Sequence, residues 1–192
     1  RGNIVSEKRG NLTTTYAYDA LGQLIRVNDP HENATWVYSY DRGGNITSKA
    51  KYAYTTGTVG TALESIPYSY GDANWKDKLT AYNGTAITYD AIGNPLNDGA
   101  WTYTWAAGRQ LKKMVREDRT LDFKYNHNGM RIQKVLQHDW YPETTNYTYH
   151  GKLLTHMEVE YYDFDEVKHT DKLHFFYDAQ SRPVKISYNG VI

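Results

Sequence analysis

Tyr16-Ala17-Tyr18-Asp19-Ala20-Leu21-Gly22-Gln23-Leu24 and Tyr38-Ser39-Tyr40-Asp41-Arg42-Gly43-Gly44-Asn45-Ile46 are two copies of one short phrase, Tyr-x-Tyr-Asp-x-x-Gly-x-Leu/Ile. The phrase glycines are separated by 20 residues from Gly2 to Gly22, 22 from Gly22 to Gly44, 21 from Gly108 to Gly129 and 22 from Gly129 to Gly151. A period of this size matches one hairpin-sized unit. The sequence therefore predicts a repeat protein.

Weaker copies of the phrase extend the pattern over nearly the whole chain. They occupy residues 88–93, 103–108, 123–129, 147–151 and 175–181. We expect one repeat segment over residues 1–192 with about eight hairpin repeats, in which residues 66–86 form an irregular longer repeat.

The aromatic residues of each copy stand at positions i and i+2, which point to the same face of an extended strand. Three-rung runs such as Trp36/Tyr38/Tyr40 and Trp101/Tyr103/Trp105 keep this period of two, which a helix would scatter around its circumference. The sequence predicts an aromatic ladder that holds successive hairpins together. Its members are Tyr16, Tyr18, Tyr38, Tyr40, Tyr89, Tyr103, Trp105, Tyr125, Tyr147, Tyr149 and Tyr177.

The Asp and Gly of the phrase predict a tight turn after each ladder. An Asp side chain accepts backbone amide hydrogen bonds two residues further on, and Gly supplies the positive φ that closes a short loop. The predicted structural turn residues are Asp19, Gly22, Asp41, Gly44, Asp90, Gly93, Gly108, Gly129, Gly151 and Asp178. Strand, turn and return strand together indicate an all-β fold of consecutive antiparallel hairpins in a curved, twisted open sheet.

Residues 109–118 leave two interpretations open. Leu111, Met114 and Val115 have the spacing of a short amphipathic helix. Leu111 also falls in the Leu position of the repeat, which favours a strand.

Composition excludes several classes of function. With 22 basic and 22 acidic residues the formal net charge is zero, so no preference for nucleic acid or a membrane surface is expected. Acidic residues nevertheless outnumber lysines seven to two over residues 155–178. No cysteine is present, which removes disulfides and thiolate chemistry. No run reaches the roughly 18 apolar residues of a membrane span.

No catalytic or metal-binding constellation stands out, so we expect no enzyme, metal or cofactor. The histidines are dispersed without zinc-site spacing, although His127 and His150 fall on successive predicted turns. The acidic stretch 163–166 is expected to be a hairpin tip rather than a calcium loop. The repeated Asp residues share one turn position, so a structural role explains all of them together.

The phrase and its period resemble the YD repeat, also called the RHS repeat, of bacterial wall-associated polymorphic toxins, toxin-complex shells and teneurins. Further similar phrases are Tyr68–Gly84 and Asp90–Leu96. The resemblance implies a secreted or surface-displayed bacterial protein in which a non-enzymatic β-sheet strip encloses or displays a C-terminal toxin. The implied partners are neighbouring repeats and the C-terminal toxin or core domain.

The chain begins and ends within repeats, which predicts a piece of a longer protein, and nothing in it resembles the family's core plug or self-cleaving segment. Bare edge strands of such a piece are expected to pair into dimers. The alternative function is a carbohydrate-binding or cell-surface adhesion strip, because exposed aromatic rows can stack on sugar rings. Its predicted glycan-binding residues are Trp36, Tyr38, Trp101, Tyr103 and Trp105.

Overall fold

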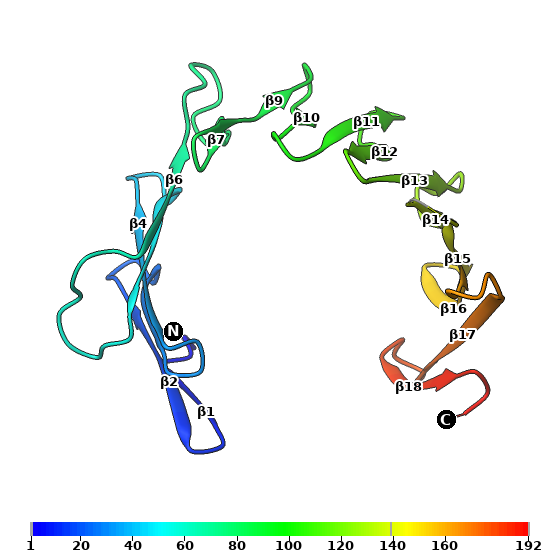
Figure 1. Ribbon diagram of the computed structural model, residues 1–192, viewed down its shortest axis with the longest axis horizontal. Coiled ribbons are helices and arrows are strands. Elements are labelled where there is room, and N and C mark those ends of the chain that lie inside the picture. The colour runs from blue at the N-terminus through cyan, green and yellow to red at the C-terminus, as the bar shows by residue number, and fades with distance from the viewer. Residues whose placement is uncertain (1, 139, 192) are drawn as a thin grey trace. The chain divides into compact units, whose positions relative to one another are not determined.

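The computed structural model describes residues 2–138 and 140–191, and within them every regular element is a β-strand. This confirms the prediction of an all-β fold built from antiparallel hairpins. The chain forms two compact units, Arg1–Ile87 and Thr88–Ile192, each with one sheet (Figure 1). The part that the structure describes contains no helix long and apolar enough to cross a membrane.

The first unit holds an eight-stranded sheet among its described residues, with strands in the order of the sequence. Each strand pairs antiparallel with the next. The strands are β1 (Ser6–Arg9), β2 (Leu12–Tyr18), β3 (Leu24–Asp29), β4 (Ala34–Tyr40), β5 (Ile46–Ala53), β6 (Glu64–Ser69), β7 (Ala81–Tyr82) and β8 (Thr85–Ala86).

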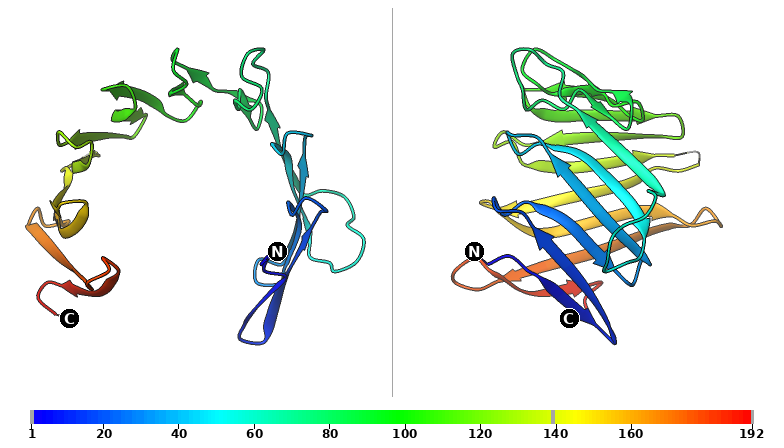
Figure 2. Two further views of the ribbon diagram at one scale, coloured as in Figure 1. Left: turned by 180° about the vertical axis from the view of Figure 1, so that it is seen from behind. Right: turned by 90° about the vertical axis from the view of Figure 1, so that its left-hand side faces the viewer.

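The second unit holds a ten-stranded sheet among its described residues, again antiparallel and in sequence order, and its strands twist progressively (Figure 2). The strands are β9 (Thr88–Tyr89), β10 (Pro95–Asn97), β11 (Thr102–Ala106), β12 (Gln110–Arg116), β13 (Arg119–Tyr125), β14 (Arg131–Gln137), β15 (Glu143–His150), β16 (Leu153–Tyr162), β17 (Lys168–Tyr177) and β18 (Pro183–Tyr188).

The strands are thus arranged in two sheets, whereas the sequence predicted one continuous strip. In the described structure, pairing stops between β8 and β9, which are two residues long each. Such short strands offer few backbone groups for a ladder. The irregular stretch 66–86 contains most of β6 and all of β7 and β8, with a long loop between β6 and β7.

Residues 110–116 form strand β12, so the helical alternative for this segment is wrong. Met114 lies opposite Tyr103 of β11 on one side and Leu121 of β13 on the other. These cross-strand pairs satisfy the backbone and cover Met114, and such tertiary pairing overrides a local helical pattern.

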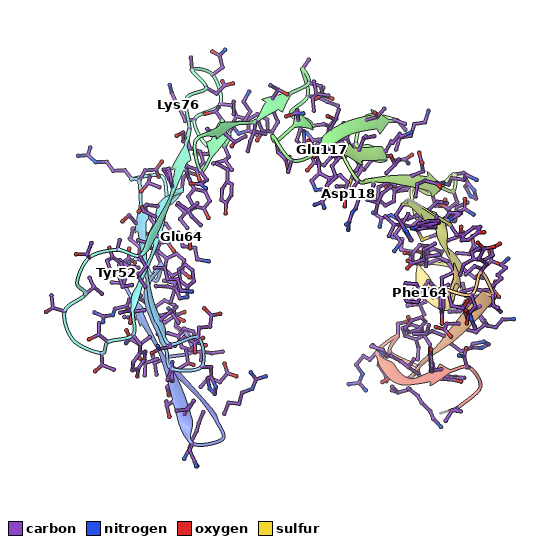
Figure 3. All side chains as sticks on the ribbon, in the orientation of Figure 1. Tyr52, Glu64, Lys76, Glu117, Asp118 and Phe164 are labelled. Carbon is purple, nitrogen blue, oxygen red and sulfur yellow. The ribbon has the colours of Figure 1, made fainter. Side chains whose placement is uncertain are left out.

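Each sheet is a single layer with side chains on both faces (Figure 3). The buried hydrophobic residues of the described chain are Val27, Ala34, Ala50, Ile66 and Phe123. Because so little apolar surface is buried, cross-strand pairs and hydrogen bonds must supply much of the stability. The positions where one hairpin joins the next therefore matter most.

Candidate functional site: the repeat junction

The repeat turn is organised by one carboxylate. In the turn after β4, Asp41 Oδ1 accepts the amides of Gly43 at 2.8 Å and Asn45 at 2.9 Å. The Asp41 amide also donates to the Asn45 carbonyl at 2.9 Å. The same side-chain bonds recur at Asp19, Asp90, Asn126, Asp163 and Asp178.

The fourth residue of this turn adopts a left-handed conformation. Gly22, Gly44, Gly93 and Gly129 have φ between 76° and 89°. Glu166 and Ser181 hold the same position with φ 62°, a conformation that side chains with a Cβ adopt only with strain. Gly108 and Gly151 also have positive φ, in shorter turns.

The turn at Asp163 lies at the opposite end of the strands from the other repeat turns. It joins β16 to β17, whereas the other turns join a ladder strand to its return strand. The sequence predicted a hairpin tip here but not a repeat turn, since Glu166 replaces the glycine. The Asp alone, four residues before Val167, was the available signal.

A β-bulge lies at the second aromatic residue of most phrases. Ser39 pairs with Ser48 and Tyr40 with Ile46, so Thr47 is the extra residue on the return strand. Register shifts occur at the equivalent step before Tyr18, Trp105, Tyr125, Tyr149 and Tyr177. A bulge bends its strand and redirects the neighbouring side chain.

The redirected side chain bonds to the preceding hairpin. Tyr40 Oη donates to the Leu24 carbonyl at 2.7 Å. The last backbone pair between β3 and β4 is Arg26 with Val37, so the two strands separate before Leu24 and the hydroxyl bridges the gap. We call this bond the junction bond.

The junction bond recurs at least seven times across the described residues. Its donors and acceptors are Tyr18 to Ile4, Tyr40 to Leu24, Tyr70 to Ile46, Trp105 Nε1 to Pro95, Tyr125 to Leu111, Tyr149 to Arg131 and Tyr177 to Leu154. The distances lie between 2.6 and 3.0 Å. Tyr70 was not among the predicted ladder residues, although its Tyr68-x-Tyr70 phrase was visible.

The first aromatic residue of a phrase behaves differently. Tyr16 Oη donates to Glu7 at 3.3 Å and Tyr103 Oη to Asp98 at 2.6 Å. Burial, with the bonded Asp98 carboxylate, raises the pKa of Tyr103 to about 12. Burial also raises the pKa of Tyr38. Of the other ladder residues, Tyr89 lies opposite Pro95 and Tyr147 opposite Met157.

A second kind of side-chain hydrogen bond links neighbouring turns. Asn94 is 4% exposed, and its Nδ2 donates to Asp90 Oδ2 at 2.8 Å and to the Gly108 carbonyl at 2.7 Å. It therefore links two successive turns of the second unit. This role was not predicted from the sequence, although Asn45 repeats the residue type at the same place and reaches Asp77 at 3.0 Å.

The predicted glycan-binding residues are engaged within the sheets. Lys49 Nζ lies 4.0 Å from the centroid of a Trp36 ring, and the Arg116 guanidinium lies 5.2 Å from that of Trp101. Trp105 and Tyr103 use their polar atoms in the bonds given above. No observation at these positions favours a sugar over the internal partners, so glycan binding there stays a prediction.

Metal-ligating groups are scattered in the described structure. Among its residues, no group of three or more His, Asp or Glu side chains is placed to hold a metal ion. His127 lies in the turn after β13, and His150 is the last residue of β15, beside the next repeat turn.

The turn carboxylates predict a dependence of stability on pH. Hydrogen bonds from Asn45, through its side chain and its backbone amide, hold the pKa of Asp41 below its usual range. A lowered folded-state pKa gives stability that is complete above the unfolded pKa and is lost as pH falls through the folded value. As the pH is lowered from about 5 to about 2, we expect the urea concentration at the midpoint of unfolding to decrease.

The Asp41→Asn variant should retain the turn, as Asn126 does, and show a weaker fall of the midpoint with acid. Parallel urea titrations at several pH values compare the two proteins. Identical acid profiles would contradict the role assigned to the Asp41 carboxylate.

Ser181 offers a stabilising substitution. Ser181→Gly should raise the free energy of unfolding by about 1 kcal/mol, because φ 62° is strained for serine and open to glycine. Gln180→Gly is the matched control: the same residue type is introduced next door, where positive φ is not needed, so stability should fall slightly. Urea denaturation measures both.

Residues 18–59 match the family model described as RHS Repeat. The relative named tRNA nuclease WapA, from Bacillus subtilis (strain 168), is 34% identical over 141 residues, which are 71% of this chain and 5% of the relative. The tRNA(Glu)-specific nuclease WapA from Bacillus subtilis subsp. natto (strain BEST195) is 38% identical over 84 residues, 42% of this chain and 3% of the relative.

The chain therefore spans only 5% or less of the length of these curated relatives. Among solved structures, a chain in the crystal structure of TcdB2-TccC3-TEV is similar with a TM-score of 0.48 and 15% identity, over 93% of this chain and 10% of that chain.

Proposed function

Because this chain belongs to the RHS/YD-repeat family, we propose that it is a non-enzymatic wall segment of a secreted or surface-displayed bacterial protein, and that the wall encloses or displays a C-terminal toxin domain. The observation that carries the proposal is the recurrent junction bond. It fastens each hairpin to the one before it and makes a single-layer sheet extendable by repetition.

The use of the repeated acids supports a structural role. Asp19, Asp41, Asp90 and Asp178 each direct a carboxylate oxygen at the amides of their own turn. A carboxylate that is occupied in this way stabilises backbone geometry and is not positioned for acid or base catalysis on an external substrate. We therefore assign these carboxylates to stabilising the turns of the sheet.

The names of the relatives suggest where an activity would lie. Those proteins are named as tRNA nucleases, and this chain matches a small fraction of their length. We assign such an activity to a part of the protein outside these repeats. The partners of the present segment are then the neighbouring repeats and the toxin or core domain, not nucleic acid.

The test uses the full reading frame in which this chain is encoded. Reading it beyond both ends should reveal further repeats and an unrelated C-terminal domain. The purified product is then digested with trypsin under native conditions, and the C-terminal domain is expected to resist cleavage. Immediate release of that domain from the intact protein would contradict enclosure.

A junction variant sharpens this test. Tyr40→Phe, Tyr125→Phe and Tyr149→Phe together remove three junction bonds and should make the C-terminal domain cleavable sooner. Tyr38→Phe with Tyr147→Phe is the matched control, because neither hydroxyl makes a junction bond in the described structure. Equal effects of both variants would exclude a specific role for the junctions.

The edge strands give a further prediction for the isolated segment. Among the described strands, β1, β8, β9 and β18 each have one neighbour, so each leaves one side of its backbone unpaired. We expect the segment alone to form dimers, which sedimentation velocity over a concentration series would detect. A monomer at all concentrations would contradict edge pairing.

A further inference from the structure

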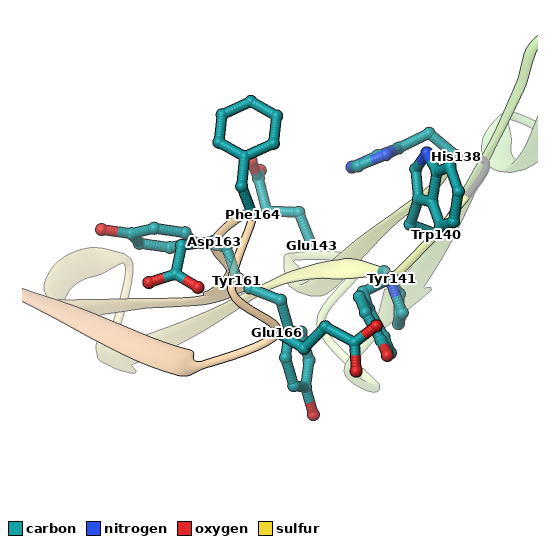
Figure 4. Close-up of a pocket in the computed structure, with 10 residues that line it drawn as sticks. His138, Trp140, Tyr141, Glu143, Tyr161, Asp163, Phe164 and Glu166 are labelled. Atoms are coloured by element: carbon teal, nitrogen blue, oxygen red, sulfur yellow. The ribbon is translucent and has the colours of Figure 1, made fainter.

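One groove of the second unit differs in character from the repeat junctions. It lies between the loop after β14 and the Asp163–Val167 turn, and its volume is about 750 Å³ (Figure 4). Its described lining is aromatic and acidic, with one histidine and without lysine or arginine. Neither loop contributes a member of the aromatic ladder.

Two aromatic residues of the groove are exposed to an unusual degree. Trp140 is 84% exposed and Phe164 is 107% exposed. The Tyr141 and Tyr162 rings stack beside them with centroids 4.5 Å apart. Large apolar side chains gathered at a surface without a share in the core are typical of an interaction site.

The carboxylates of the groove differ in whether a basic side chain pairs with them. Glu143 Oε1 pairs with Lys134 at 3.1 Å, and Asp163 Oδ2 pairs with His169 at 2.6 Å. Glu166 extends towards Tyr141 (Figure 4), and its bond to that hydroxyl raises the Tyr141 pKa. In the described structure, Glu166 is thus the groove carboxylate with no cationic partner.

The backbone at Glu166 is an independent observation. Glycine fills the same turn position at Gly22, Gly44 and Gly129, whereas Glu166, like Ser181, adopts φ 62° with a side chain. A non-glycine residue in this region is strained, and such strain is concentrated at functional positions. Here the strained residue directs a carboxylate into an aromatic groove.

We propose that this groove docks a lysine- or arginine-bearing segment of another polypeptide. The faces of aromatic rings carry negative electrostatic potential, so they attract a cation and complement the carboxylates. A guanidinium group can stack on the Trp140 indole and pair with Glu166. Trp140 and Phe164 are too exposed to enclose a small free cation, which favours long side chains on an extended chain.

Binding is measured by fluorescence anisotropy with labelled Arg-Gly, Lys-Gly, Glu-Gly and Ser-Gly repeat peptides on the 192-residue chain. The basic peptides should bind, and their affinity should fall as salt rises from about 20 to 300 mM because salt screens exposed charges. The acidic and neutral peptides should not bind. A neutral oligosaccharide is included as a competitor.

Two substitutions test whether the peptide binds at this groove. Trp140→Ala should weaken binding of the Arg-Gly peptide about fivefold through loss of a cation–π contact. Glu166→Gly should weaken it about fivefold through loss of an ion pair, while the turn gains the residue its φ suits. A folded and more thermostable Glu166→Gly protein with reduced affinity separates binding from folding.

Ser181→Gly is the matched control, because it makes the same relief of positive φ in the turn that joins β17 to β18. It should raise thermal stability and leave peptide affinity unchanged. Absence of basic-peptide binding, binding that neither Trp140→Ala nor Glu166→Gly reduces, or displacement by the neutral oligosaccharide would each overturn the proposal.

Discussion

Replacing Gly22 by valine is expected to lower the free energy of unfolding by about 2–3 kcal/mol. Gly22 has φ +87° at the fourth position of the Asp19 turn. Its added Cβ would lie 3.6 Å from Asn3 Nδ2, an ordinary contact. The cost therefore comes from the backbone conformation, which a β-branched side chain tolerates least.

Gly60→Val is the matched control for this substitution. Gly60 is exposed, its φ is not in the left-handed region, and no heavy atom lies within 4 Å of an added Cβ. Urea denaturation should show little change for Gly60→Val. A loss smaller than about 0.5 kcal/mol for Gly22→Val, the size of an ordinary surface effect, would contradict the turn assignment.

Tyr40→Ala should have a still larger effect, a loss of about 3 kcal/mol. The substitution removes a half-buried ring and the bond to the Leu24 carbonyl at 2.7 Å. It therefore removes the hydrogen bond that joins β3 to β4 beyond their last backbone pair, Arg26 with Val37.

The Tyr40→Phe variant divides this effect into its parts. It keeps the ring and removes the hydroxyl, so the expected loss is about 1 kcal/mol. Amide hydrogen exchange should then accelerate at the turn ends of β3 and β5 and remain slow at the Arg26–Val37 pair. Uniform acceleration along both strands would show that the hydroxyl does not act locally.

The sequence predicted the strands and hairpins because their signals are local. Aromatic residues two apart, as in Tyr38 and Tyr40, indicate a strand, and Asp followed by Gly three residues later indicates a turn. The same local reasoning left residues 109–118 ambiguous, since Met114 is covered by Tyr103 and Leu121 from other strands. Only the pairing between strands decides between helix and strand there.

The details of the junctions could not be predicted for a related reason. That Tyr40 binds the Leu24 carbonyl depends on a bulge in one hairpin and on where the ladder to the preceding hairpin ends. Neither the bulge nor the end of the ladder can be recognised from the residues of the phrase. The Asp163 turn was missed as a repeat turn because Glu166 stands in the glycine position, and the groove beside it joins two loops that are distant in sequence.

The order of the strands has a consequence for synthesis on the ribosome. Within each sheet, every strand pairs only with the strands before and after it in the described chain. Each new hairpin can therefore dock on the one already made, without waiting for a distant segment to emerge. Recombination that removes or adds whole repeats of about 21 residues would leave the same kind of edge strand for the next hairpin to pair with. The next repeat must then supply a tyrosine that donates a junction bond to the last unpaired carbonyl.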